Sequence, residues 1–147
     1  LFQIIGRGPR KPILEQRVEE ANLDNCQFLP FQSDEMFPFS LSAADIGVVI
    51  LDETTSKGSV PSKSYNLMSY GIPSLYFASG DSELQRYANQ YGHAFCCTSS
   101  DLDQAEMFIL DLKQNKAKYR QMQLQAEQAA RDFKRSNADK FVKKYLQ

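Results

Sequence analysis

The sequence predicts an α/β fold in which a parallel β-sheet is flanked by helices. Short apolar runs of strand length alternate with longer amphipathic segments over the 147 residues, a pattern typical of repeated strand–helix–strand units. The run 46–51 is apolar throughout, as expected of a strand covered on both faces of a parallel sheet. Several amphipathic segments stop at a glycine, a typical helix end. Because crossovers between parallel strands are short and right-handed, we expect one sheet of five parallel strands.

Five segments have the length and composition of strands. They are short, several are β-branched or aromatic, and most end at Gly, Pro or Asp. The predicted strands are 2–6, 26–30, 46–51, 74–78 and 94–97. Ligands of such sheets bind beyond the carboxyl ends of the strands, so we expect functional residues in the loops that follow them.

The segments between the strands have helical patterns. Ser33 is a suitable N-cap, and Gly71 and Gly92 stand where helices are expected to end. The expected helices cover 13–21, 34–44, 59–70, 82–91, a segment opened by Ser100, and 117–147 with a break near 136–137.

Composition excludes several functional classes. Hydrophobic residues make up 42% of the sequence, charged residues 24%, and the formal net charge is −1, so no basic surface for nucleic acid is indicated. No apolar run approaches the length of a membrane span. Cys26, Cys96 and Cys97 have neither disulfide-framework nor zinc-site spacing and are interpreted as free thiols in a reducing cytoplasm. We expect no metal and no cofactor.

The most informative pattern is a polar stripe on the helix expected over 59–70. Its residues follow the spacing i, i+3, i+4 and i+7 of one helix face, and they are Ser59, Ser62, Lys63 and Asn66. The opposite face carries Tyr65, Leu67 and Met68. Free backbone N–H groups and the helix dipole at such an amino end favour phosphate, and a lysine adds a full charge. The alternative is a solvated helix face with a serine cap.

The same stretch resembles a known family. Val60-Pro61-Ser62-Lys63, continued by Tyr-x-x-Met-x-x-Gly-x-Pro, is similar to the donor-binding helix of family-4-like glycosyltransferases of the GT-B fold. Three other segments also resemble segments of that family and occur in the same order along the chain. They are the strand and GxGP-like loop at 2–9, Asn-Cys-Gln-Phe-Leu-Pro at 25–30, and Ala-Asp-Ile-Gly-Val-Val at 44–49. The resemblance covers residues 2 to about 80.

The resemblance implies a Rossmann-like sheet, the C-terminal half of a GT-B fold, that binds a nucleoside diphosphate sugar as substrate. It implies that Ser62 and Lys63 contact the pyrophosphate, that the loop at Phe31 and Gln32 holds the base, and that Asn66 lies at the ribose. In the loop that begins at Gly6, one of the cations Arg7, Arg10 or Lys11 would help Lys63 to bind the phosphates. Two positions depart from the family pattern, since Gly58 and Asn66 stand where it carries glutamates.

The resemblance also implies how the protein is organised. Residues 1–147 are interpreted as a single donor-binding domain with C-terminal helices at 116–147. Because the chain begins at Leu1, inside a strand-like run and without Met, we interpret it as a fragment that lacks the N-terminal acceptor domain and is inactive alone. The full protein would be a cytoplasmic, hexosyltransferase-like and retaining enzyme of cell-surface polysaccharide or glycolipid synthesis. Peripheral contact with the inner membrane face and self-association of the fragment are further expectations.

Two other functions stay open from the sequence. One is a nucleotide-sugar epimerase of GT-B fold, which needs ionisable acid and base groups. The other is a catalytically degenerate binding module, which the missing glutamates favour. Asp52 and Glu53, after a predicted strand, are either functional acids or part of a solvated loop. The single histidine, His93, is expected to pack or cap rather than to catalyse.

Overall fold

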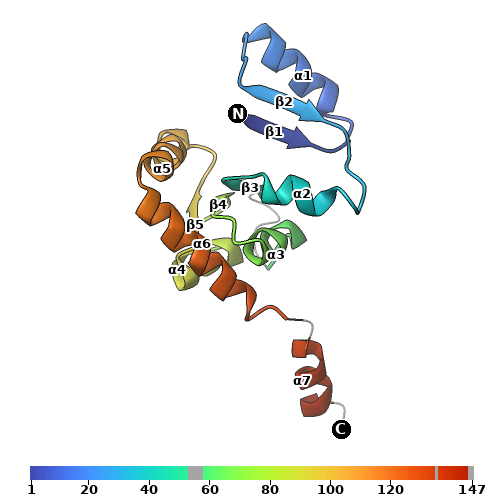
Figure 1. Ribbon diagram of the computed structural model, residues 1–147, viewed down its shortest axis with the longest axis vertical. Helices are drawn as coiled ribbons and strands as arrows, with labels where there is room; N and C mark the ends of the chain where they lie inside the picture. The colour runs from blue at the N-terminus through green and yellow to red at the C-terminus, as the bar shows by residue number, and fades with distance from the viewer. Residues whose placement is uncertain (53–57, 135, 146–147) are drawn as a thin grey trace. The chain divides into compact units, whose positions relative to one another are not determined.

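The computed structural model describes residues 1–52, 58–134 and 136–145, and in the last of these ranges it leaves out the side chains of 138 and 141 (Figure 1). The chain divides into two compact units, Leu1–Ala43 and Ala44–Gln147. We call them unit 1 and unit 2, and each is described by itself.

Unit 1 is a small strand–helix–strand element. Strands β1 (Phe2–Ile5) and β2 (Cys26–Leu29) are parallel, with Phe2 opposite Cys26 and Ile5 opposite Leu29. Helix α1 (Lys11–Glu20) connects them, and the short helix α2 (Phe37–Ser42) follows β2. Every side chain of the unit is exposed or half-buried, so unit 1 has no buried core of its own.

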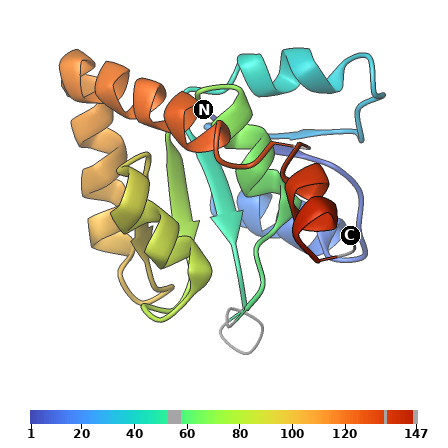
Figure 2. The same ribbon diagram turned by 90° about the horizontal axis from the view of Figure 1, so that it is seen from below.

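Unit 2 contains a three-stranded parallel sheet in the order β3-β4-β5. Its strands are β3 (Gly47–Ile50), β4 (Ser74–Phe77) and β5 (Ala94–Cys97). Its helices are α3 (Ser62–Ser69), α4 (Glu83–Tyr91), α5 (Leu102–Gln114), α6 (Lys116–Ala130) and α7 (Ser136–Tyr145). Figure 2 shows β3 and β4 side by side and pointing the same way. The predicted α/β class, with parallel sheets flanked by helices, is confirmed.

All five predicted strands form. In unit 1 β1 pairs with β2, and in unit 2 the sheet order is β3-β4-β5. The expectation that all five strands share one sheet stays a prediction. Each observed parallel pair is joined by a helix that returns the chain beside the preceding strand, as in α1 between β1 and β2.

The core of unit 2 covers both faces of its sheet. Adjacent residues of a strand point to opposite faces, and Leu75 and Tyr76 of β4 are both fully buried. One cluster joins Leu75 and Cys97 to α5 and to Met122 of α6. A second cluster joins Met68 of α3, Tyr87 of α4 and Ala129 of α6.

The predicted glycine stops of α3 and α4 are confirmed. Gly71 has φ +64°, and two hydrogen bonds close the end of α3 in the manner of a Schellman motif, from Gly71 N to Met68 O (3.0 Å) and from Ile72 N to Leu67 O (3.0 Å). Helix α4 ends at Gly92, φ +72°, and begins at Ser82, whose hydroxyl accepts from Gln85 N.

Other predicted helix ends are wrong. Helix α5 is preceded by Asp101 rather than Ser100, and the Asp101 carboxylate turns back to accept from Thr98 N (3.1 Å) and Thr98 Oγ1 (2.5 Å). Those bonds lower the Asp101 pKa, the side-chain bond most. The helix expected over 34–44 shortens to α2, which has Pro38 in its first turn. The break in the C-terminal helices begins after Ala130, earlier than expected.

His93 is buried beside Tyr76, which confirms its expected packing role. Its Nε2 lies 2.9 Å from the Tyr76 hydroxyl, and its Nδ1 has no hydrogen-bond partner among the described residues. Burial lowers the pKa of His93 to about 4 and raises that of Tyr76 above its ordinary value. The imidazole is therefore neutral in the folded protein at neutral pH.

Because its folded pKa is depressed, His93 makes stability depend on pH. Between the unfolded pKa near 6.5 and the folded value of about 4, the unfolded chain binds the extra proton, so stability is lost as pH falls through this window. We expect the free energy of unfolding to be about 2 kcal/mol lower at pH 5 than at pH 7.5 from this group alone. Urea unfolding of wild type and His93→Gln at both pH values tests this, and an unchanged pH dependence in the variant would contradict it.

Candidate functional site

The amino end of α3 carries two of the predicted site residues, Ser62 and Lys63, and both are exposed. The helix begins after Pro61, whose φ of −62° and ψ of 136° are extended. Ser64, which is buried, anchors the first turn because its hydroxyl and its backbone N–H both bond to Pro61 O, at 2.7 Å and 3.0 Å. The first N–H groups of an α-helix have no acceptor within it, and Lys63 adds a positive charge to this end of the chain segment.

Ser59 does not share the helix face, so that expectation is wrong. It lies in the loop before α3, next to Gly58, which has φ +74°. The physical reason is Pro61, because the residue before a proline disfavours helical dihedrals and the helix cannot extend back through Val60. The proposed role of Ser59 in binding stays a prediction.

The exposure of most α3 residues is as predicted. Lys63 is exposed and Asn66 half-buried, whereas Leu67 and Met68 are buried. Tyr65 is half-buried rather than mostly buried. Leu67 follows Lys63 by four residues and so lies on the same side of the helix as Lys63, not opposite it.

Helix α3 lies close against the strand that precedes it. A Cβ added at Gly47 of β3 would be 2.4 Å from both Leu67 methyl carbons, a separation at which atoms must move. The glycine therefore permits the approach of β3 and α3. The sequence patterns above do not predict the roles of Gly47 and Ser64. The Pro-x-x-Ser spacing from Pro61 to Ser64 is a local signal that could have indicated the role of Ser64.

In unit 1 the other predicted residues come together at the carboxyl ends of β1 and β2. The Arg7 guanidinium carbon lies 5.2 Å from the centre of the Phe31 ring, a cation–π contact. Phe31 is 65% exposed. Gln32 donates from Nε2 to Pro30 O at 2.7 Å. Gly6, with φ +148°, turns the chain out of β1 in a conformation that other residues rarely adopt.

A narrow hollow lies at the carboxyl end of the unit 2 sheet. It measures about 40 Å³ and lies between the ends of the three strands, lined by Ile50, Leu51, Phe77, Ala78, Thr98 and Ser99. This volume is far below the several hundred Å³ of a typical ligand pocket. Asp52, one of the two predicted acids, is exposed after β3, and Glu53 lies outside the described residues.

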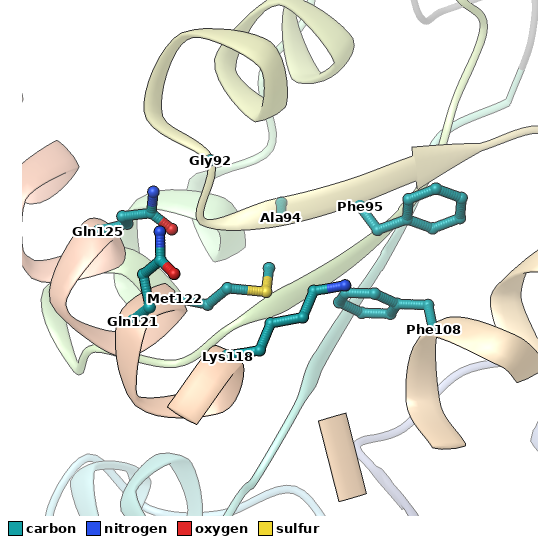
Figure 3. Close-up of a pocket in the computed structure, with 8 residues that line it drawn as sticks. All are labelled: Gly92, Ala94, Phe95, Phe108, Lys118, Gln121, Met122 and Gln125. Atoms are coloured by element: carbon teal, nitrogen blue, oxygen red, sulfur yellow. The ribbon is translucent and has the colours of Figure 1, made fainter. Parts of the chain in front are cut away.

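A larger hollow of about 260 Å³ lies at the opposite end of β5 (Figure 3). It is lined by Gly92, Ala94, Phe95, Phe108, Lys118, Gln121, Met122 and Gln125. Lys118 at its rim is paired with Asp111, Nζ to Oδ2 at 2.5 Å. The hollow contains no predicted site residue and lies at the amino end of the strand, where parallel sheets do not usually bind ligands.

The described titratable groups offer little for proton transfer. Burial raises the pKa of Cys96 to about 11 and also raises that of Cys97, so both thiols stay protonated at neutral pH. Across the described ranges, no three side chains of His, Cys, Asp or Glu come together as a metal site. In that part of the chain, no helix has the length and hydropathy needed to cross a bilayer.

Two curated proteins are similar to this chain. The first is WcaI of Escherichia coli K12, named for a colanic acid biosynthesis glycosyl transferase, which is 30% identical over 97 residues, 65% of this chain and 24% of that protein. The second is the UDP-glycosyltransferase TURAN of Arabidopsis thaliana, 33% identical over 75 residues, 50% of this chain and 16% of TURAN. This chain is related to glycosyltransferases. The matches span about a quarter or less of the length of these relatives. No family model matches the chain.

Proposed function

We propose that this chain is the donor-binding part of a GT-B-type, family-4-like glycosyltransferase and binds a nucleoside diphosphate sugar. The observation that carries the proposal is the exposed Ser62–Lys63 pair at the amino end of α3, the helix that follows β3 in the chain, in a chain similar to two glycosyltransferases. A helix amino end with an adjacent lysine is suited to phosphate.

In this proposal Ser62, Lys63 and the first N–H groups of α3 bind the pyrophosphate. When the bond between the sugar and the diphosphate breaks, the nucleoside diphosphate leaves with the electron pair, and negative charge develops on its terminal phosphate. Preorganised donors and a lysine stabilise charge that develops in this way. Lys63 therefore serves both binding and departure of the leaving group.

The other predicted residues are proposed to contact the nucleoside. The exposed Phe31 ring offers a π face for a base, Gln32 offers amide hydrogen bonds, and Asn66 can donate to and accept from a ribose diol. Gly6 forms the turn that carries Arg7, which supplies a further cation for the phosphates. An acceptor from polysaccharide or glycolipid synthesis is supported by the colanic acid name of WcaI.

Titration calorimetry with a panel of UDP-, GDP- and ADP-sugars tests this function. We expect saturable binding of at least one member and none of the free sugar, because the proposed contacts go to the nucleoside diphosphate. A chain that binds no member of the panel would contradict donor binding. It would support the degenerate binding module, which Gly58 and Asn66 favour because neither supplies a carboxylate.

A further inference from the structure

An aromatic cluster lies on the inner side of α3. It consists of Tyr65 from α3, Tyr87 and Tyr91 from α4, and Phe133 from the segment that follows α6; we call it the Phe133 cluster. The Phe133 ring centre lies 4.9 Å from that of Tyr65, 5.1 Å from that of Tyr87 and 6.0 Å from that of Tyr91. One side chain from beyond α6 thus contacts both α3 and α4.

Polar contacts anchor the segment that carries Phe133. The Tyr91 hydroxyl donates to Asp132 Oδ2 at 2.9 Å, and Asn137 Nδ2 donates to Asp132 O at 2.5 Å. Backbone N–H groups of Asp132 and Phe133 bond to Ala129 O and Ala130 O. Phe133 is therefore held by its own backbone as well as by the rings around it.

The Phe133 cluster lies behind the part of α3 that presents Lys63. Tyr65 follows Lys63 by two residues, and residues so spaced lie on different sides of a helix. Val60, in the loop before α3, packs against the same core as Tyr65 and Phe133. Tyr65 belongs to the first turn of α3, so the packing of its ring on Phe133 is one of the contacts that hold this turn.

We propose that Phe133 is a positioning residue for donor binding, acting through Tyr65 to hold the amino end of α3 in its phosphate-binding position. This inference rests on the proposed function. Phe133 does not contact the diphosphate itself. It keeps the first turn of α3 ordered, and that turn contacts the diphosphate.

The first test measures hydrogen–deuterium exchange by mass spectrometry in the full chain. Phe133→Leu removes the ring and keeps an apolar side chain, whereas Phe133→Tyr keeps the ring. Phe108→Leu is the matched control, because Phe108 stacks on Phe95 at 5.3 Å in the other core cluster. We expect exchange over 62–69 to rise about three- to tenfold in Phe133→Leu, with little change in the other two variants.

The second test titrates the same proteins with inorganic pyrophosphate. We expect affinity about three- to tenfold weaker in Phe133→Leu and close to wild type in Phe133→Tyr and Phe108→Leu. Equal exchange over 62–69 in Phe133→Leu and Phe108→Leu would overturn the inference, as would faster exchange with unchanged affinity. A wild type that binds no pyrophosphate overturns phosphate binding at α3 itself, and the exchange data then still report whether Phe133 orders that helix.

Discussion

Replacing Lys63 by Ala is expected to weaken binding of the nucleoside diphosphate sugar by about 1.5–3 kcal/mol, the range for a hydrogen bond to a charged group. This corresponds to roughly a ten- to hundredfold rise in Kd. The reason is that Lys63 is exposed at the amino end of α3 and adds a full charge to the N–H groups there. Titration calorimetry of wild type and variant, with the donor found in the panel, measures the effect.

Lys113→Ala is the matched control for this substitution. Lys113 is also an exposed helical lysine of unit 2, in the last turn of α5, so its loss changes the net charge equally. We expect it to leave affinity unchanged, and both variants to unfold like wild type because exposed lysines contribute little to stability. Unchanged affinity in Lys63→Ala would move the phosphate site elsewhere, to the cations of 7–11.

Replacing Leu112 by Ala is expected to reduce the free energy of unfolding by about 2–5 kcal/mol. Leu112 is 2% exposed and packs in one cluster with Leu75, Phe108 and Met122. Truncation removes its transfer free energy and leaves a cavity between α5 and the sheet, which rigid strands cannot close. Urea unfolding followed by circular dichroism measures the loss.

The same helix offers a control for Leu112. Leu110 is 44% exposed, and Leu110→Ala removes the same atoms from the surface of α5. We expect its effect to stay within about 0.5 kcal/mol. Similar losses for the two variants would mean that α5 packs on the sheet through a different face.

Local features of this fold could be predicted from sequence, and pairing between distant segments could not. The β5 bounds and the glycine stops at Gly71 and Gly92 follow from backbone preferences of a few neighbouring residues. The expected start of α3 at residue 59 is too early because Pro61 keeps Val60 out of helical dihedrals. Strand order depends on where each crossover returns, which no short window contains, so the single five-stranded sheet stays a prediction.

The candidate site could be predicted in the same partial way. Helical periodicity separated the face of Lys63 from that of Met68, and the structure agrees. The contact of Arg7 with Phe31 joins two loops that are far apart in sequence, so spacing could not predict it. The packing of Phe133 on Tyr65 likewise depends on where α6 crosses the other helices. Binding by these residues is still a prediction.

The absence of buried side chains from unit 1 bears on how donor binding and folding are linked. Apolar burial is the main favourable term in folding, and a strand pair with little of it is marginally stable. The β1–α1–β2 segment is therefore expected to open at low free energy, while cooperative unfolding belongs to unit 2. Phe31 and Gln32, proposed to hold the base, lie in the segment of low stability. A nucleotide that binds only the folded form of this segment raises the free energy of its opening by mass action. Affinity for the base and the stability of unit 1 are therefore thermodynamically linked.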